Sequence, residues 1–322
     1  MKIKNLFEPI KEARGMEAAT ASQTQLVSAV MKGDRAALAR AITLVENDPG
    51  RASRLLERLG PPGRAFIVGV TGPPGTGKST LVDRLIDFYR GLGLTVGVVA
   101  VDPSSPLTGG ALLGDRIRMT SHAGDRGVYI RSMASRGWTG GLSRATSQAI
   151  RLMEAAGFEV ILLETVGIGQ SDVEVVGVSH SVLVVMMPGL GDDVQVSKAG
   201  LMEVGDIYVV NKADLEGADS MVVSLLSLFR GSRRSPPVLK VSALTGEGIE
   251  NLRKAIDEAR KRFASGDYGL RVRSAKGMIV ETARGAVEAR LAAVSESRAE
   301  FLARLVVEGK LSVEEAAKRL SR

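Results

Sequence analysis

The chain of 322 residues contains no cysteine and only two histidines, and it carries a formal net charge of +7 at pH 7. The lack of cysteine excludes disulfides, thiolate zinc sites, iron–sulfur clusters and cysteine nucleophiles. His122 and His180 lie far apart in the sequence, so we expect surface or packing positions for them rather than a histidine-rich metal site. Hydrophobic residues make up 44% and charged residues 25%, which supplies a buried core and argues against global disorder.

The positive charge would suit phosphate groups, nucleic acid or an acidic partner, but the composition narrows this choice. Aromatic residues make up only 4%, which argues against the stacking platforms of single-strand binders, so we expect no nucleic-acid partner. No segment reaches the ~18 uninterrupted apolar residues of a membrane helix, and residues 1–11 lack the apolar stretch of a secretory signal. The sequence therefore predicts a cytoplasmic protein without a membrane partner.

Residues 1–62 contain no strand-like run and are predicted to form an N-terminal helical extension. Apolar residues spaced four and three apart predict an amphipathic helix over residues 33–47, with Asp34 as its N-cap. Asp48 and the proline after it fit the N-cap and the first position of a second helix. The Gly-Pro-Pro-Gly run at 60–63 then marks a domain boundary.

Residues 63–264 alternate short apolar runs, rich in valine and isoleucine, with helical stretches. Runs that are apolar on both faces are typical of parallel strands buried between two layers of helices. We therefore predict an α/β domain built on a doubly wound, mainly parallel sheet, with its ligand at the carboxyl ends of the strands. The predicted strands are Ala65–Val70, Thr95–Val101, Val128–Arg131, Val160–Leu163, Val182–Met187, Ile207–Val210 and Val238–Val241.

Residues 265–322 are again helical in pattern and are predicted to form a C-terminal arm. Apolar residues recur at every fourth position from Ile279 to Leu291, and Ser312 with Glu315 fits a capping box at the start of the last helix. The arm is too short and too rich in alanine to bury a core of its own. We expect it to pack on the central domain or on a second subunit.

A complete Walker A sequence, Gly-Pro-Pro-Gly-Thr-Gly-Lys-Ser-Thr, follows the first predicted strand and precedes a predicted helix over Thr80–Arg90. In such a loop the glycines allow backbone N–H groups to converge on phosphate oxygens at the positive end of the helix. Lys78 would bridge the β- and γ-phosphates, and the Ser79 hydroxyl would bind Mg²⁺. The predicted phosphate-binding residues are Gly72, Pro73, Pro74, Gly75, Thr76, Gly77, Lys78, Ser79 and Thr80.

A second motif, Asn-Lys-Ala-Asp at 211–214, directly follows the predicted strand Ile207–Val210 and matches the N-K-x-D reader of guanine. Asp214 can accept the N1 and N2 protons of guanine, whereas adenine would leave the carboxylate without these donors. The Ser-Ala-Leu-Thr-Gly run after the last predicted strand matches the loop whose backbone N–H contacts guanine O6. GTP, rather than ATP, is therefore the predicted nucleotide. The predicted base-binding residues are Asn211, Lys212, Asp214, Ser242, Ala243 and Leu244.

The hydrolysis machinery is expected between these two motifs. A predicted strand is followed by Glu164-Thr-Val-Gly167, at the place where most GTPases carry D-x-x-G. The Gly167 N–H suits the γ-phosphate. Glu164 would lie near the Mg²⁺ water shell or position the attacking water. Asp102 ends another strand and is predicted to contact Mg²⁺ directly or through water. Asp115 is a second candidate metal ligand, with an ordinary solvated loop acid as the alternative. The candidates for an arginine finger, none of which can be assigned, are Arg116, Arg118, Arg131 and Arg136.

Several runs outside the generic GTPase set occur together in this chain. They are Arg40–Asn47, Val101–Ser105, Thr108–Gly110, Leu113–Arg116, Glu164–Gln170, Gly191–Asp193 and Lys198–Gly200. In this combination the chain resembles the methylmalonyl-CoA mutase-associated G proteins of the MeaB/MMAA type, once described as arginine/ornithine transport kinases. These are P-loop GTPases of the dimerising, signal-recognition-like class. The resemblance extends from about residue 30 to the end of the chain.

The resemblance implies a mechanism and a partner. By position, the family's phosphate, magnesium and hydrolysis residues match Lys78, Ser79, Asp102, Asp115 and Glu164, and its additional, partner-sensing switch loop matches Pro188–Lys198. Members of the family are homodimers held partly by the C-terminal helical arm. They act as GTP-driven chaperones of adenosylcobalamin-dependent acyl-CoA mutases, gating cofactor loading and protecting the mutase from inactivation.

Two alternatives stay open at this point. A P-loop kinase would fit the older transport-kinase description, but it needs a pocket for an acceptor, and the guanine motif would serve no purpose in an ATP-using kinase. A metal-insertion GTPase shares the architecture but delivers metal through cysteine and histidine clusters, which this chain lacks.

The chain departs from the family pattern at Ile130–Trp138 and at Gly189 and Leu190. The residues do not indicate which mutase is served, or whether a cobalamin adenosyltransferase is also contacted. Because no arginine finger can be assigned, we predict slow intrinsic GTP hydrolysis that the partner accelerates.

Overall fold

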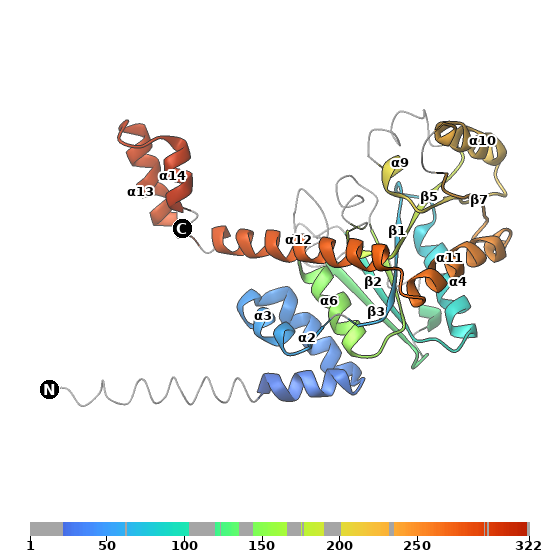
Figure 1. The fold of residues 1–322 in the computed structure, drawn as a ribbon, viewed down its shortest axis with the longest axis horizontal. Coiled ribbons are helices and arrows are strands. Elements are labelled where there is room, and N and C mark those ends of the chain that lie inside the picture. Colours follow the sequence, from blue (N-terminus) through green and yellow to red (C-terminus); the bar gives the residue numbers. More distant parts are fainter. Residues whose placement is uncertain are drawn as a thin grey trace. The chain divides into compact units, whose positions relative to one another are not determined.

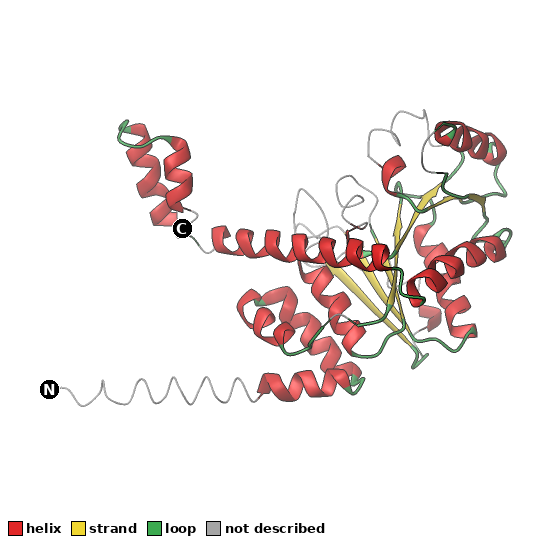
Figure 2. Cartoon of the chain, viewed as in Figure 1, coloured by secondary structure: helices red, strands yellow, loops and turns green. Residues whose placement is uncertain are grey.

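The structure is a computed structural model, and it describes residues 22–61, 63–102, 120–122, 124–134, 144–165, 175, 177–189, 201–231, 235–292, 294 and 296–320. The chain divides into two compact units, Met1–Gly277 and Met278–Arg322, and each is described by itself. Figure 1 labels the elements along the chain, and Figure 2 distinguishes helices from strands by colour. The domain limits expected at residues 62 and 264 stay predictions.

Seven strands of the first unit form one sheet in the order β3-β2-β4-β1-β5-β6-β7, and every neighbouring pair is parallel. This confirms the predicted doubly wound α/β sheet, which is parallel throughout. Strand β1 lies between β4 and β5, where the strand order reverses direction, and such a switch point opens a crevice at the carboxyl ends of the strands. The strands are β1 (Phe66–Thr71), β2 (Val96–Asp102), β3 (Val128–Ala134), β4 (Val160–Glu164), β5 (Ser181–Met186), β6 (Ile207–Val210) and β7 (Val238–Lys240).

One face of the sheet is covered by α4 (Lys78–Gly91) and α11 (Ile249–Ala264) (Figure 1). Both helices share a core with alternate side chains of β1, Phe66, Val68 and Val70, which are almost fully buried. The side chains between them are also apolar and buried, so the other face of the sheet needs a second layer of helices.

The opposite face is covered in part by α6 (Arg144–Ala155), which packs against β2. The approach is close, since a β-carbon at Gly97 of β2 would lie 2.9 Å from the sulfur of Met153. Farther along the sheet, Phe229 of α10 (Ala218–Phe229) packs on Tyr208 of β6 with the ring centroids 4.8 Å apart. The strands therefore lie between two helical layers, as their two-sided apolar pattern predicted.

Helices α2 (Arg35–Asn47) and α3 (Pro49–Glu57) follow a helical stretch over residues 22–31. The predicted caps are confirmed, because the carboxylates of Asp34 and Asp48 accept hydrogen bonds from backbone N–H groups three residues on, at 2.8 and 2.9 Å. Both helices pack on α6 and so extend the helical layer on that face.

Helix α12 (Tyr268–Ala292) begins in the first unit. There Arg273 forms an ion pair with Asp206 at 3.0 Å, between β5 and β6. Farther along the helix, a β-carbon at Gly277 would lie 1.8 Å from the carbonyl oxygen of Gly177, so only glycine allows this contact. The start of the predicted C-terminal arm thus packs on the central sheet domain.

The second unit holds the rest of α12 together with α13 (Glu296–Val307) and α14 (Val313–Leu320). The Glu315 N–H donates to Ser312 Oγ at 3.1 Å, which confirms the serine half of the predicted capping box. No helix in the described ranges combines the length and the hydropathy that crossing a membrane requires. The structure also describes two short elements, the 3-10 helix η2 (Thr120–His122) and α9 (Leu201–Val204).

Candidate nucleotide-binding site

The glycine-rich loop that begins at Gly72 connects β1 to α4 at the carboxyl edge of the sheet. Gly72 has a φ of 138°, and a β-carbon there would lie 2.0 Å from the carbonyl oxygen of Val185, so no other residue fits. Gly77 is the N-cap of α4 with a φ of 87°, and no side chain caps this helix end. Uncapped N–H groups and the positive end of the helix dipole make the start of α4 a site for anions.

Lys78 is buried inside this loop. Its Nζ donates hydrogen bonds to the carbonyl oxygens of Gly72 at 2.9 Å and Pro73 at 3.1 Å. The hydroxyl of Thr76 donates to the same Pro73 carbonyl at 2.9 Å and braces the turn. The loop therefore holds a positive charge close to the N–H groups that would bind phosphate oxygens.

Ser79 and Glu164 meet at the carboxyl edge of the sheet, where Ser79 Oγ donates to Glu164 Oε1 at 2.7 Å and both side chains are buried. Strands β1 and β4 are neighbours in register, with Val70 opposite Glu164. The chain just after Glu164 is fixed as well, since the Thr165 N–H donates to the Val70 carbonyl at 3.1 Å and its hydroxyl to Thr71 Oγ1 at 3.0 Å. A hydroxyl and a carboxylate are the oxygen ligands that Mg²⁺ prefers, so this pair fits that ion.

Asn211 follows β6 and connects the base-reading motifs to the phosphate loop. Its Nδ2 donates to the Thr76 carbonyl at 2.7 Å, and its Oδ1 accepts from the Ala243 N–H at 3.0 Å. A β-carbon at Gly77 would lie 2.5 Å from Asn211 Nδ2, so glycine is needed for this approach. One buried amide of the Asn-Lys-Ala-Asp loop thus contacts both the phosphate loop and the loop at Ala243.

Asp214 is exposed, and its carboxylate accepts a hydrogen bond from Ser242 Oγ at 2.6 Å. This hydrogen bond holds the pKa of Asp214 below its usual value, so the group is an ionised acceptor at neutral pH. Lys212, between Asn211 and Asp214, has a φ of 57° and is the one non-glycine residue with a left-handed backbone among those described. Backbone strain of this kind persists only where surrounding contacts impose it, and it concentrates at functional sites.

Arg84 is a candidate functional residue that the motifs did not identify. It lies on α4, and its Nε donates to the Ala243 carbonyl at 2.9 Å while Nη2 donates to the Leu244 carbonyl at 3.0 Å. The guanidinium therefore holds the predicted O6-binding loop against the helix of the phosphate loop. The one signal for it in the sequence is its spacing, seven residues after Gly77 and so on the same helix face.

Part of the predicted machinery lies outside the described residues. Asp102 is the last residue of β2 and comes two positions after Ala100, which pairs with Glu164. The backbone of Asp102 therefore lies at the same sheet edge as Glu164. The side chain of Asp102 is among those not described. The other predicted residues outside the described ranges are Asp115, Gly167, Arg116, Arg118 and Arg136, together with residues 190–198 of the expected switch loop.

Among the four arginine-finger candidates, the structure describes Arg131. It lies in β3, and its guanidinium forms an ion pair with Glu46 and donates to Thr43 Oγ1 at 3.2 Å, both on α2. Arg131 thus holds the N-terminal extension on the sheet in this structure.

The two histidines are both buried. His180 accepts the Ile67 N–H at Nδ1 over 2.9 Å, and its ring packs against Phe66 and Phe263 with centroid separations of 6.0 and 4.0 Å. This confirms the packing position expected for His180. Within the described ranges His122 does not pack against aromatic rings in this way, and its Nε2 lies 3.0 Å from Asp83 Oδ1 on α4.

Comparison with known proteins identifies the family. Residues 38–297 match the family model described as Methylmalonyl Co-A mutase-associated GTPase MeaB. A protein of Pyrococcus horikoshii named as a GTPase is 53% identical over 245 residues, which cover 74% of this chain and 77% of that protein. The mouse protein "Methylmalonic aciduria type A homolog, mitochondrial" is 38% identical over 274 residues, which cover 77% of this chain and 65% of the mouse protein.

A solved structure described as "Crystal structure of LAO/AO transport system kinase" superposes with a TM-score of 0.68 at 28% identity and covers 94% of this chain and 97% of that one. The family model spans the phosphate loop, the Ser79–Glu164 pair and the guanine motifs, and its match extends over most of the chain. The chain therefore belongs to the MeaB family of methylmalonyl Co-A mutase-associated GTPases and is itself a GTPase that binds GTP and GDP.

Proposed function

We propose that this GTPase is a G-protein chaperone of an adenosylcobalamin-dependent acyl-CoA mutase of the methylmalonyl-CoA mutase type. In this role it gates cofactor loading and protects the mutase from inactivation. The observation that carries the proposal is the extent of the family match, since residues 38–297 include α3 and α12 as well as the GTPase core. These flanking helices are not part of a generic GTPase domain, so their match favours the partner class named by the family. The name of the mouse relative, which refers to methylmalonic aciduria, supports the same partner class.

The proposed catalysis depends on positioning and electrostatics rather than on a covalent intermediate. Lys78 and the N–H groups at the start of α4 neutralise charge on the phosphates. Glu164, fixed at the end of β4, positions the attacking water or a metal-bound water, and the Gly167 N–H contacts the γ-phosphate. Because no arginine finger is assigned, intrinsic turnover is slow and the partner accelerates it.

Mg²⁺ would be held by Ser79 Oγ, with the carboxylates of Asp102, Asp115 and Glu164 as further candidate ligands. A serine hydroxyl has one proton and two lone pairs, so Ser79 can bind a cation while it still donates to Glu164. When bound, the ion neutralises negative charge on the β- and γ-phosphate oxygens.

A capture experiment with a purified mutase tests the chaperone role. The chain loaded with a non-hydrolysable GTP analogue should retain the mutase, and added mutase should accelerate GTP hydrolysis. Asp214→Asn is the matched control, because it should lose the GTP analogue and the mutase together and regain both with the corresponding xanthosine analogue. Equal retention of the mutase in every nucleotide state, with no change in hydrolysis, would remove the chaperone role and leave the GTPase assignment intact.

Two other functions are distinguished by the same reagents. A transport-type kinase, favoured by the name of the structural relative, would transfer phosphate to an acceptor and release little of it to water. The contact of Asp214 with Ser242 prepares a reader of guanine, which an ATP-using kinase does not need. A metal-insertion GTPase needs a transferable cargo metal, yet the chain has no cysteine and only two histidines.

The C-terminal arm is the proposed dimerisation element of a cytoplasmic homodimer. In the second unit, Phe301, Val307 and Val313 are 61%, 88% and 65% exposed, which is apolar surface that a second copy would cover. Light scattering of the full chain, with Phe301→Ser and Val307→Ser as variants, measures the change from dimer to monomer.

Capture of a cobalamin adenosyltransferase in place of the mutase would identify a second partner of the same system.

A further inference from the structure

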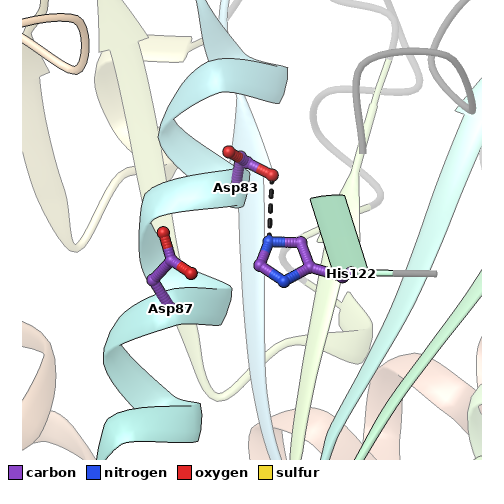
Figure 3. A group of neighbouring side chains, drawn as sticks. All are labelled: Asp83, Asp87 and His122. Atoms are coloured by element: carbon purple, nitrogen blue, oxygen red, sulfur yellow. Dashed lines mark ion pairs between the residues drawn. The ribbon is translucent and has the colours of Figure 1, made fainter. Parts of the chain in front are cut away.

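We propose that Asp83, Asp87 and His122 form a site for a divalent transition-metal ion of the zinc type, apart from the nucleotide site. Asp83 and Asp87 lie one turn apart on the same face of α4. His122 ends η2, and its ring points toward that helix face (Figure 3). One ligand atom from each of the three side chains lies within 4.8 Å of the other two.

His122 distinguishes this cluster from an ordinary acidic helix face. Its side chain is only 8% exposed, and Nε2 lies 3.0 Å from Asp83 Oδ1. Nε2 nevertheless has no hydrogen-bond partner within the described part of the chain. A buried polar atom without a hydrogen bond is unfavourable, and a cation that binds both the nitrogen and the carboxylate oxygen would satisfy it.

The separation of these atoms suits two ligands of one metal ion. Nitrogen and oxygen ligands lie about 2.0–2.2 Å from Zn²⁺, so two ligands of a tetrahedral ion are roughly 3.3–3.5 Å apart. The 3.0 Å between His122 Nε2 and Asp83 Oδ1 is close to that value. Asp87 is exposed and has no hydrogen bond or ion pair with any described residue, so its side chain can rotate to bring an oxygen to the third position. Solvent water would complete the four ligands.

The charges and the donor atoms favour zinc over magnesium. Two carboxylates four residues apart on a helix repel each other, and a bound dication removes that repulsion. The neighbouring cation Arg90 does not neutralise these two carboxylates, because it forms an ion pair with Asp125 at 2.7 Å. An imidazole nitrogen suits Zn²⁺, whereas Mg²⁺ prefers six oxygen ligands, many of them water. A site of this kind needs one histidine and no cysteine.

The proposed ion would fasten η2 to the helix of the phosphate loop. Asp83 lies one turn after Ser79 on α4, and Ser121 Oγ of η2 already donates to Asp83 Oδ1 at 3.2 Å. Residues 103–119, which precede η2, contain the candidate metal ligand Asp115 of the nucleotide site. Because the ion binds only the folded arrangement, it should stabilise the chain independently of nucleotide.

Zinc binding to the full chain tests the proposal directly. The chain is stripped of metal, loaded with GDP and excess Mg²⁺ to occupy the nucleotide site, and dialysed against Zn²⁺. We expect one bound equivalent and a higher Tm. Asp87→Asn should weaken zinc binding roughly tenfold or more and abolish the rise in Tm, while GDP affinity stays unchanged. Asp219→Asn, which removes an exposed acid paired with Lys240 elsewhere, is the matched control and should bind zinc as the wild type does.

His122→Gln tests the buried ligand, and Co²⁺ in place of Zn²⁺ should show a visible absorption band in the wild type that this variant loses. If His122→Gln does not fold, Asp87→Asn decides the matter, because Asp87 is exposed and has no hydrogen bond or ion pair with a described residue. Equal zinc binding by the wild type and Asp87→Asn would overturn the site. Zinc that is bound only when GDP and Mg²⁺ are omitted would place the ion in the nucleotide site and would equally overturn it.

Discussion

The side-chain amide of Asn211 donates a hydrogen bond to the backbone carbonyl of Thr76 at 2.7 Å, across 135 residues of sequence. The same amide accepts the Ala243 N–H at 3.0 Å. The loops that bind the base and the loop that binds phosphate therefore share one buried side chain. Ordering of either loop by the nucleotide should favour the bound arrangement of the other.

Asn211→Ala should weaken both nucleotide binding and the fold. The change leaves the Thr76 carbonyl and the Ala243 N–H buried without this partner, at about 1–3 kcal/mol for each group. We expect the free energy of unfolding to fall by about 2–4 kcal/mol and GDP affinity to fall more than about tenfold. Urea unfolding and displacement of a fluorescent GDP measure the two effects. Asn251→Ala, at an exposed position on α11, is the control, and an equal effect there would show that the bond to Thr76 is not the cause.

Asp214→Asn should change the base that the site selects. The guanine N1 and N2 protons need an acceptor, and an asparagine amide would turn an N–H donor toward them. Xanthine carries an oxygen where guanine has its amino group, so it can accept from that amide. We expect GTP affinity to fall at least about a hundredfold and xanthosine triphosphate to bind in its place, because hydrogen bonds to charged groups are worth roughly 1.5–3 kcal/mol each. Competition binding with both nucleotides measures the switch, and unchanged selectivity would exclude Asp214 as the reader.

All seven strands and both N-terminal caps were predictable because their signals are local. A run that is apolar on both faces needs no distant information to be read as a buried parallel strand. A glycine-rich loop between such a strand and a helix likewise carries its own spacing. The structure places Lys78, Ser79, Glu164 and Asn211 at one edge of the sheet because the parallel strands end there together.

The long-range contacts within the site were not predictable from local pattern. The spacing of Arg84 from Gly77 indicates a face of α4 but no partner, and the structure shows that Arg84 donates to the loop at Ala243 whereas Arg90 pairs with Asp125. The positions of these arginines around the helix decide their partners only once the strands have been ordered in the sheet. The same holds for His122, whose partner Asp83 lies on a helix far earlier in the chain.

Glu164→Gln should separate hydrolysis from binding. The glutamine keeps the size of the side chain and can still accept from Ser79 Oγ, but it carries no charge to order a water or a metal-bound water. We expect the single-turnover rate of GTP hydrolysis to fall about 10²–10⁴-fold, with GTP affinity changed less than about tenfold. Glu258→Gln, an exposed glutamate on α11, is the matched control. An unchanged rate in Glu164→Gln would remove Glu164 from the hydrolysis step.

Arg84→Met should weaken guanine nucleotide binding without abolishing it. Methionine keeps most of the apolar stem but loses the hydrogen bonds to the Ala243 and Leu244 carbonyls. These contacts are partly solvated, so we expect a loss of about 1 kcal/mol, or roughly fivefold in GDP affinity, through faster dissociation. Arg54→Met, at an exposed position on α3, should leave the dissociation rate unchanged. Identical dissociation rates for the two variants would show that Arg84 does not hold the loop.

Glu154 on α6 should make the stability of the fold depend on pH. Its side chain is 9% exposed, and burial raises the pKa of the carboxyl to about 7, although hydrogen bonds from the Gly63 and Ala65 N–H groups partly oppose this. In the unfolded chain a glutamate titrates near ~4.3, so between these values the folded chain binds more protons than the unfolded chain. The free energy of unfolding should therefore fall as pH rises through this window, by about 2–3 kcal/mol between pH 5 and 8.

Glu154→Gln removes the titratable carboxyl group and should flatten the pH dependence of the free energy of unfolding. Urea unfolding at pH 5 and pH 8 measures it, with Glu258→Gln, an exposed glutamate, expected to keep the wild-type slope. A poorly fitting amide would lower the stability equally at both pH values, so only the difference between them reports on the buried proton. If the free energy of unfolding fell by the same amount between pH 5 and 8 in the wild type and in Glu154→Gln, another group would be responsible for the pH dependence.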